Sequence, residues 1–315
     1  DEAGTAITTG DNNTLIGTFS GDAMSTSSAN TAVGSFSMTS MTDGGDNVAV
    51  GTSALDIDTK GSKTVAIGRN ALGSQNFTSA TNTHNTAVGS ESGASVTTGI
   101  ENTLIGSKVG DALTDADFNV AMGYQALTTD TQGSKSVAIG YETLKAQNFS
   151  SATDSRNTAV GYQAGLSVTT ATSNVLVGSL SGDALTVGNS NTVVGDAALT
   201  TDTQGDRAVA IGTNALATQN FTSSTDNYNV GVGYSAGTSI TTGFQNTIVG
   251  GSAGDALTDA DRNVAIGYVA LSSDTLGGRS TAVGYGALGT QNFTSATDSY
   301  NTAVGYSAGI NVTTG

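Results

Sequence analysis

The chain has 315 residues, with 43 glycines, no proline, cysteine or tryptophan, and a formal net charge of −16 from 26 acidic and 10 basic residues. This charge argues against nucleic acid or an anionic membrane as partners, because both select a basic face. No apolar run approaches the roughly 20 residues that cross a bilayer, so we expect no membrane insertion of this segment.

One five-residue phrase, mostly Asn-Thr/Val-x-Val/Ile-Gly, recurs seventeen times. Its glycines stand at 17, 34, 51, 68, 89, 106, 123, 140, 161, 178, 195, 212, 233, 250, 267, 284 and 305. The spacings run 17, 17, 17 and 21 residues, and this set repeats four times. A fixed period over a whole chain indicates stacked repeats. We therefore predict one continuous domain over 1–315, with super-repeats near 89–160, 161–232 and 233–304.

Each coil is predicted to contain a short strand that ends just before its glycine. The residue before the glycine is Val, Ile or Met, and the residue three before it is Thr or Val. These two share one face of a strand, and we expect them to form the inner core. The residue between them is also apolar, mostly Ala, which predicts that the opposite face is covered as well. We expect that cover to be an identical chain in a homo-oligomer, most simply a trimer.

A second segment follows each glycine. The third residue after the glycine is usually small, and the fourth is Leu or Met in nine coils and Gly in eight. We interpret it as a second strand or extended arm that closes the coil. The predicted fold is thus an all-β parallel β-solenoid of about 17 coils, a narrow β-roll. At ~4.8 Å per coil, it would form a rod of roughly 80 Å, with a super-period of about 19 Å.

The Asn and Gly of the phrase are predicted to be structural corners. Asn stands four residues before the glycine in thirteen coils, where its amide can bond to the next coil, and the glycine suits a turn with positive φ. The corners of the long coils are Asn85, Gly89, Asn157, Gly161, Asn229, Gly233, Asn301 and Gly305. Phosphate binding is disfavoured because no helix begins at these glycines.

The repeated phrase resembles known fibre repeats. Asn-Thr-Ala-Val-Gly-Tyr-Gln-Ala-Gly at 157–165 and Asn-Val-Ala-Ile-Gly-Tyr at 263–268 are similar to the YadA-like head repeats of trimeric autotransporter adhesins. They are also similar to Asn-Thr-Ala-Ile-Gly-Tyr repeats in fibre proteins of aquatic phages and large viruses. The resemblance covers nearly the whole chain and implies a left-handed β-roll of three chains. Coils are longer here, however, and the sequence begins and ends inside a repeat, so we expect a segment of a longer fibre.

The 21-residue coils contain near-copies of one loop, Gln-Asn-Phe-Thr/Ser. Its aromatic residues are Phe77, Phe149, Phe221 and Phe293, and its Asn-x-Ser/Thr glycosylation acceptors are Asn76, Asn148, Asn220 and Asn292. A protruding Phe would give a repeated surface contact with a cell-surface glycan or a neighbouring filament. The alternative, which we favour, is a Phe folded back to shield the edge of the roll.

Aspartates gather in turns at 111–117 and 255–261 and at Asp130, Asp202 and Asp274. Binding of Ca²⁺ by these turns is one interpretation, because this ion takes six to eight oxygen ligands. We favour the alternative, that the turns are solvated and hold no metal. Lys60, Lys63, Lys135, Arg207 and Arg279 recur near one turn, where we expect them to act as solubilising charges or to pair with nearby Asp. The single His84 is replaced by Arg or Tyr in the other long coils. We therefore predict no catalytic, cofactor or metal residues and no enzyme.

These features favour a structural extracellular or virion fibre segment that gives reach, stiffness and multivalent surface adhesion. The alternatives are an ice- or calcium-binding β-solenoid adhesin segment, or a non-catalytic part of a phage tail spike. Ice binding would require a flat outward array such as Thr-x-Thr, and the expected inner position of the Thr residues argues against it. The expected location is the cell surface or virion surface.

Overall fold

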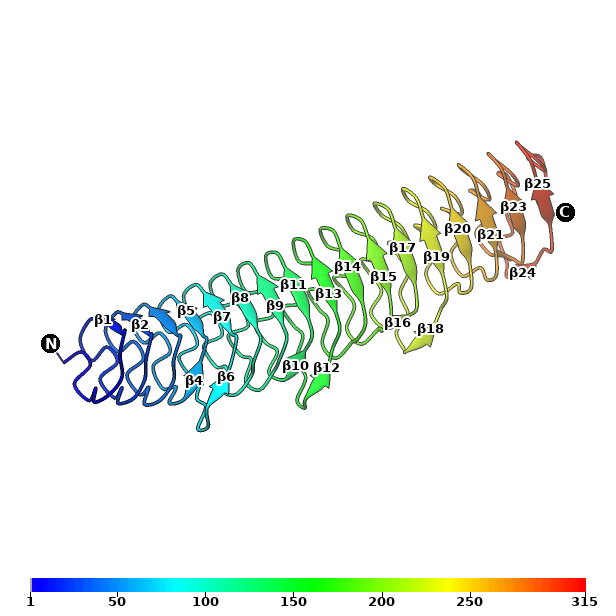
Figure 1. Ribbon diagram of the computed structural model, residues 1–315. Helices are drawn as coiled ribbons and strands as arrows, with labels where there is room; N and C mark the ends of the chain where they lie inside the picture. The colour runs from blue at the N-terminus through cyan, green and yellow to red at the C-terminus, as the bar shows by residue number, and fades with distance from the viewer. Residues whose placement is uncertain (1) are drawn as a thin grey trace. The chain divides into compact units, whose positions relative to one another are not determined.

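The computed structural model describes residues 2–315, which form strands, turns and bends without a helix. The chain divides into two compact units, residues 1–156 and 157–315. Within each unit, every coil contributes one three-residue strand to a parallel ladder, and short strand pairs lie away from that ladder (Figure 1). The predicted all-β parallel solenoid of seventeen coils is confirmed.

The ladder of the first unit has eight strands: β1 (Thr14–Ile16), β2 (Thr31–Val33), β3 (Val48–Val50), β5 (Val65–Ile67), β7 (Thr86–Val88), β8 (Thr103–Ile105), β9 (Val120–Met122) and β11 (Val137–Ile139). The ladder of the second unit has nine: β13 (Thr158–Val160), β14 (Val175–Val177), β15 (Thr192–Val194), β17 (Val209–Ile211), β19 (Val230–Val232), β20 (Thr247–Val249), β21 (Val264–Ile266), β23 (Thr281–Val283) and β25 (Thr302–Val304).

Equivalent residues of successive coils stack directly on one another. Between β19 and β20, for example, Gly231 lies opposite Ile248 and Val232 opposite Val249. The same parallel, in-register pairing joins the 17-residue and the 21-residue coils. The extra four residues of a long coil are therefore accommodated outside the ladder.

The two faces of the strand are the reverse of our expectation. The middle residue, such as Leu104 or Ile248, is fully buried, and the Thr, Val and Ile on either side are half-buried or exposed. The prediction that the β-branched rows form the inner core is thus wrong. Both faces are apolar, so the two-residue alternation does not reveal which one is inside. The inward-facing row of the strand is mostly Ala, because side chains from the opposite turn fill the rest of the coil interior.

That opposite wall consists of turns, and the predicted second strand is absent from the described residues. In nine coils the fourth residue after the glycine is a buried Leu or Met with positive φ, as at Leu55 (φ 51°). A residue in this conformation cannot continue an extended strand. Where Gly takes the place, as at Gly93, an added Cβ would lie 2.8 Å from Leu104 Cδ1. The buried Val96, three residues further on, fills that part of the core.

The Asn residues form hydrogen-bonded lines over three successive coils, as predicted, and each line ends at the Thr, Ser or Ala that replaces Asn before a long coil. Asn85 Oδ1 accepts a bond of 2.9 Å from the backbone N–H of Asn102, and Asn102 Oδ1 accepts one of 3.0 Å from Asn119. The Asn85 Nδ2 group donates to Gly99 O in the next coil. Positive φ, however, falls on the residue before each Asn, such as His84 (φ 51°). The Asn therefore supports the corner by hydrogen bonding alone.

The glycine corners are confirmed as sites that admit no side chain. Gly89 has φ +136°, and a Cβ there would lie 2.2 Å from Gly106 O. Gly233 has the same φ, and its Cβ would lie 2.6 Å from Gly250 O. Both the conformation and the close approach of neighbouring coils require glycine.

Candidate functional site

A second, two-residue strand pair joins each 21-residue coil to the 17-residue coil before it. These pairs are β4 (Gly61–Ser62) with β6 (Thr81–Asn82), β10 (Gly133–Ser134) with β12 (Thr153–Asp154), β16 (Gly205–Asp206) with β18 (Thr225–Asp226), and β22 (Gly277–Gly278) with β24 (Thr297–Asp298). Each pair is parallel. The Gln-Asn-Phe loop leads into the second strand of each pair, so this repeated loop is held at both ends.

A buried carboxylate anchors each loop. In the first one, Asp58 Oδ1 accepts hydrogen bonds of 3.0 Å from the backbone N–H groups of Gly61 and Phe77. Asp58 Oδ2 accepts a 2.6 Å bond from Gln75 Nε2, and Gln75 Oε1 accepts one from Asn85. The Asp–Gln pair recurs at Asp130 with Gln147, Asp202 with Gln219, and Asp274 with Gln291.

These four aspartates are fully buried, so our reading of Asp130, Asp202 and Asp274 as solvated turn residues is wrong. Their oxygens face N–H donors, which suit a carboxylate and would repel a cation. Sequence reasoning missed the network because Asp and Gln are ordinarily exposed. The available signal was that Asp and Gln occupy the seventh place after the glycine, where the other coils have an apolar residue.

The loop phenylalanines fold back against the solenoid. Phe77, Phe149 and Phe221 are 6–7% exposed, and Phe293 is half-buried. In the second loop, Phe149 Cδ2 would lie 2.8 Å from a Cβ added at Gly133. The rings therefore cover the short strand pair, in agreement with the shielding role that we favoured, and they are not available as protruding contacts.

The four acceptor asparagines lie on the accessible side of the loops. Asn148 and Asn292 are exposed, and Asn76 and Asn220 are half-buried. Each side-chain oxygen accepts a hydrogen bond from the Thr seventeen residues earlier, such as Thr131 to Asn148 at 3.1 Å. This bond orients the side chain and uses only the oxygen of the amide. Glycosylation at these positions remains a prediction.

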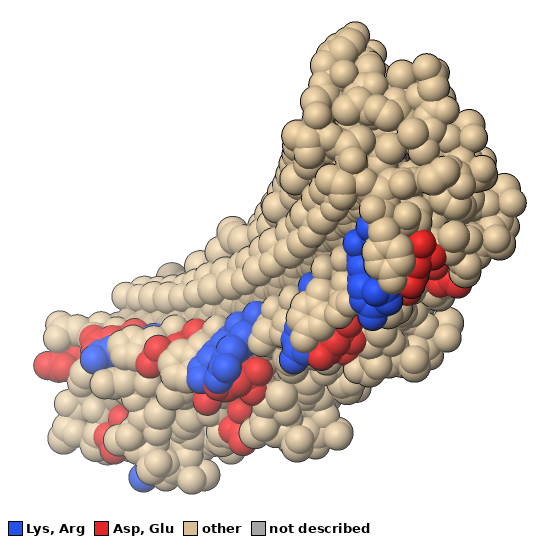
Figure 2. All heavy atoms as spheres, turned by 90° about the vertical axis from the view of Figure 1, so that its right-hand side faces the viewer, with Lys and Arg blue, Asp and Glu red and all other residues tan. Residues whose placement is uncertain are grey.

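The cations near the short strand pairs form ion pairs, as expected for three of them. Lys135 Nζ lies 2.6 Å from Asp154, Arg207 contacts Asp226, and Arg279 Nε lies 3.0 Å from Asp298. Arg207 and Arg279 also lie over the rings of Tyr228 and Tyr300. Figure 2 shows Lys and Arg side chains adjoining Asp and Glu side chains. Lys60 and Lys63 make no ion pair with a described residue, so the pairing alternative does not apply to these two.

The outer face of the ladder is an uncharged surface made of two rows of Thr, Val, Ile and Met. Its members include Ile67, Ile211 and Ile266, each 37% exposed. Thr occupies one of these rows in nine of the seventeen coils. Exposed tyrosines follow the glycine in several coils, and Tyr285 and Tyr306 stack with their ring centres 5.0 Å apart. The outer face is therefore uncharged and regularly spaced from coil to coil.

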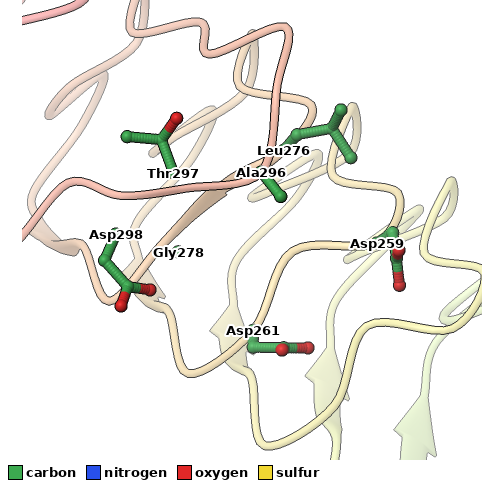
Figure 3. Close-up of a pocket in the computed structure, with 7 residues that line it drawn as sticks. All are labelled: Asp259, Asp261, Leu276, Gly278, Ala296, Thr297 and Asp298. Atoms are coloured by element: carbon green, nitrogen blue, oxygen red, sulfur yellow. The ribbon is translucent and has the colours of Figure 1, made fainter.

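One hollow, of about 270 Å³, lies beside β22 and β24 in the second unit. Asp259, Asp261 and Asp298 contribute carboxylates to it, and Leu276 and Ala296 contribute apolar surface. Figure 3 shows these side chains around Gly278. Burial raises the pKa of Asp261, although a hydrogen bond from the backbone N–H of Phe244 opposes this shift.

The last candidate residue from the sequence is His84. His84 is exposed, as are Arg156, Tyr228 and Tyr300 at the equivalent places, which agrees with a variable surface position. Within residues 2–315, no group of three His, Cys, Asp or Glu side chains has the arrangement of a metal site. The same residues contain no helix with the length and apolarity to cross a membrane.

Comparison with known proteins adds no family to this description. The chain matches no protein-family model, and it matches no curated protein sequence.

Proposed function

We propose that this chain is a structural, non-catalytic segment of an extracellular or virion fibre, and that its outer ladder face packs against further copies of the same chain. The observation that carries the proposal is the continuous, uncharged β-branched surface of each ladder. It stands on a chain with a net charge of −16. The remaining row, formed by the middle residue of each strand, is already buried inside the coil.

Stacking supports the structural part of the proposal. Within each unit the backbone of one coil bonds to the next through the ladder, the Asn lines and the turns. Repeat arrays of this kind derive stability from neighbouring coils. Such an array gives a surface appendage stiffness without cysteine or metal.

A second copy is the best-matched partner for the outer face. Two such faces have the same spacing of about 4.8 Å between coils, so the rows of one copy can pack between the rows of the other over many coils. Neither face brings a charge into the contact. We propose three copies, as in the fibre repeats that the sequence resembles, with lateral adhesion through the surfaces left outside.

Oligomeric mass tests this proposal. One chain has a mass of 31.0 kDa, so light scattering coupled to size-exclusion chromatography should give three times that value. Replacing Val249 and Val283 by Lys places two charges on the outer face and should yield the monomer. Gln245→Lys, on an exposed corner, is the control and should leave the mass unchanged. A monomeric wild-type chain would contradict the proposal.

Ice binding is a second candidate, and one observation favours it more than the sequence did. The Thr-x-Val rows point outward, as in Thr247–Val249, so the array that we expected inside is on the surface. If the wild-type chain is monomeric, a thermal hysteresis assay decides this case. Hysteresis that disappears in the Val249→Lys, Val283→Lys variant would assign the outer face to ice.

A further inference from the structure

The hollow beside β22 and β24 lies where a side chain that several other coils repeat is missing. In the equivalent position of those coils, a side-chain oxygen accepts a hydrogen bond from the backbone N–H seventeen residues before it. Ser62 Oγ accepts from Gly45 at 3.0 Å, and Ser134 Oγ accepts from Asp117 at 2.9 Å. Asp206 does the same for Asn189. Gly278 occupies this place in the 17-residue coil before the last long coil, as Gly45 does in an earlier coil.

The missing side chain leaves a donor without an acceptor. The Asp261 N–H group, equivalent to that of Asp117, makes no hydrogen bond to a described residue. A Cβ on Gly278 would lie 3.8 Å from this nitrogen, and 3.4 Å from Asp298 Oδ1. An unused donor and a carboxylate thus face the space that the Ser side chain fills in other coils.

This combination selects the chemistry of a ligand. A cation would satisfy the carboxylates of Asp259, Asp261 and Asp298 but would be repelled by the N–H group. An anion would satisfy the N–H group but would be repelled by the carboxylates. A hydroxyl group serves both, because it donates and accepts. Leu276 and Ala296, on the wall of the same hollow, offer apolar surface to the carbon atoms that carry the hydroxyls.

We propose that this hollow binds a neutral sugar residue, with one ligand hydroxyl in the place that the Ser134 hydroxyl occupies in its own coil. The volume of about 270 Å³ admits a single sugar ring. Arg279, paired with Asp298 at 3.0 Å, orients that carboxylate. The inference rests on the proposed adhesive function, for which it names one lateral contact with a glycan.

Saturation-transfer NMR with the methyl glycosides of glucose, galactose and mannose tests the site. At least one glycoside should receive saturation from the wild-type chain. Gly278→Ser restores the side chain that Ser62 and Ser134 already provide, so it should fold normally and reduce the transfer at least tenfold. Gly251→Ser is the matched control, because a Cβ there meets only the Tyr268 ring, at 3.3 Å, and binding should be retained.

Absence of transfer to all three glycosides, which would leave only water in the hollow, overturns the proposal. Equal transfer to the wild-type chain and the Gly278→Ser variant overturns it as well. Light scattering on the same samples separates this outcome from the proposed fibre function. A trimer without sugar binding would contradict only the sugar site, whereas a monomer that binds sugar would contradict only the assembly.

Discussion

Two kinds of coil alternate in pairs, and they fill the same interior by different means. In apolar coils, such as those that follow Gly161 and Gly233, the fourth residue after that glycine is again glycine. The seventh is Val168 or Ile240, and the side chains of Val168 and Ile240 are buried. In polar coils, such as those that follow Gly195 and Gly212, a buried Leu at the fourth place is combined with Asp202 or Gln219 at the seventh.

The comparison shows how a regular solenoid accepts an insertion. The four extra residues of a long coil interrupt the bonding between coils, and the buried Asp carboxylate supplies the acceptor for the freed N–H groups of the loop. A buried polar group is stable only when it is hydrogen-bonded. The Asp and Gln therefore occur together, the Asp in the coil before the insertion and the Gln at the start of the inserted loop.

The largest expected effect breaks both kinds of coil equally. Gly233→Ala, in front of an apolar coil, and Gly195→Ala, in front of a polar coil, each place a Cβ 2.6 Å from backbone atoms of the next glycine at φ of +136° and +140°. Backbone strain and overpacking together should destabilise each variant by about 3 kcal/mol. Thermal unfolding measures the loss, and Gly251→Ala should have little effect. A tolerated substitution at either corner would show that the coils stack less closely than described.

A second variant should separate the two kinds of coil. In the native chain the Asp202 carboxylate accepts hydrogen bonds from Gln219, Gly205 and Phe221. Asp202→Asn replaces one carboxylate oxygen by an NH₂ group, which cannot accept such a bond. One buried donor then loses its partner, at a cost of about 1–3 kcal/mol.

Hydrogen exchange should locate this damage in the polar coil and its loop, while the apolar coils that follow keep their protection. Asp226→Asn is the control, because the exposed ion pair with Arg207 adds little to stability. Equal destabilisation by the two substitutions would mean that the buried network does not anchor the loop.

The smallest expected effect concerns pH. Burial raises the pKa of Asp117 and Asp261 above the ordinary value of 3.8, although backbone N–H groups of Ile100 and Phe244 oppose it. A raised folded-state pKa means that the folded chain binds protons more readily than the unfolded chain. Stability should therefore rise as the pH falls from neutral through the folded pKa toward 3.8.

Thermal melting at pH 7 and pH 5 checks this sign. The double variant Asp117→Asn, Asp261→Asn should show a smaller gain at pH 5 than the wild-type chain, because the titrating groups are gone. A larger gain in the double variant would contradict the assignment to these two carboxylates.

The sequence predicted the parts of the fold that repeat in every coil. The period located all seventeen ladder strands, and the Asn and Gly positions located the corners, because these residues have few alternative uses. It did not predict the orientation of the strand, since Leu104 and its neighbours Thr103 and Ile105 are all compatible with a core. The inward Leu is decided by the turn on the opposite wall, which the strand pattern does not contain.

The candidate sites show the same difference between features that the sequence pattern predicts and features that depend on contacts with another coil. The shielding role of Phe77 could be weighed from one aromatic residue per loop, whereas the burial of Asp58 could not, because its partners Gln75 and Phe77 lie in the next coil. The hollow at Gly278 required the hydrogen bonds of Ser62 and Ser134 to be known. Aligning the repeats would have singled out this glycine, but it would not have shown the unpaired N–H group of Asp261.

Both the buried core and the proposed contact surface depend on which face of the ladder strand is outside. A density map of the chain at side-chain resolution tests this directly at β20, where Ile248 is fully buried and Val249 is on the outer face. We predict that Ile248 lies inside the coil and that Thr247 and Val249 point away from it. A map with Val249 inside the coil and Ile248 outside would contradict the account.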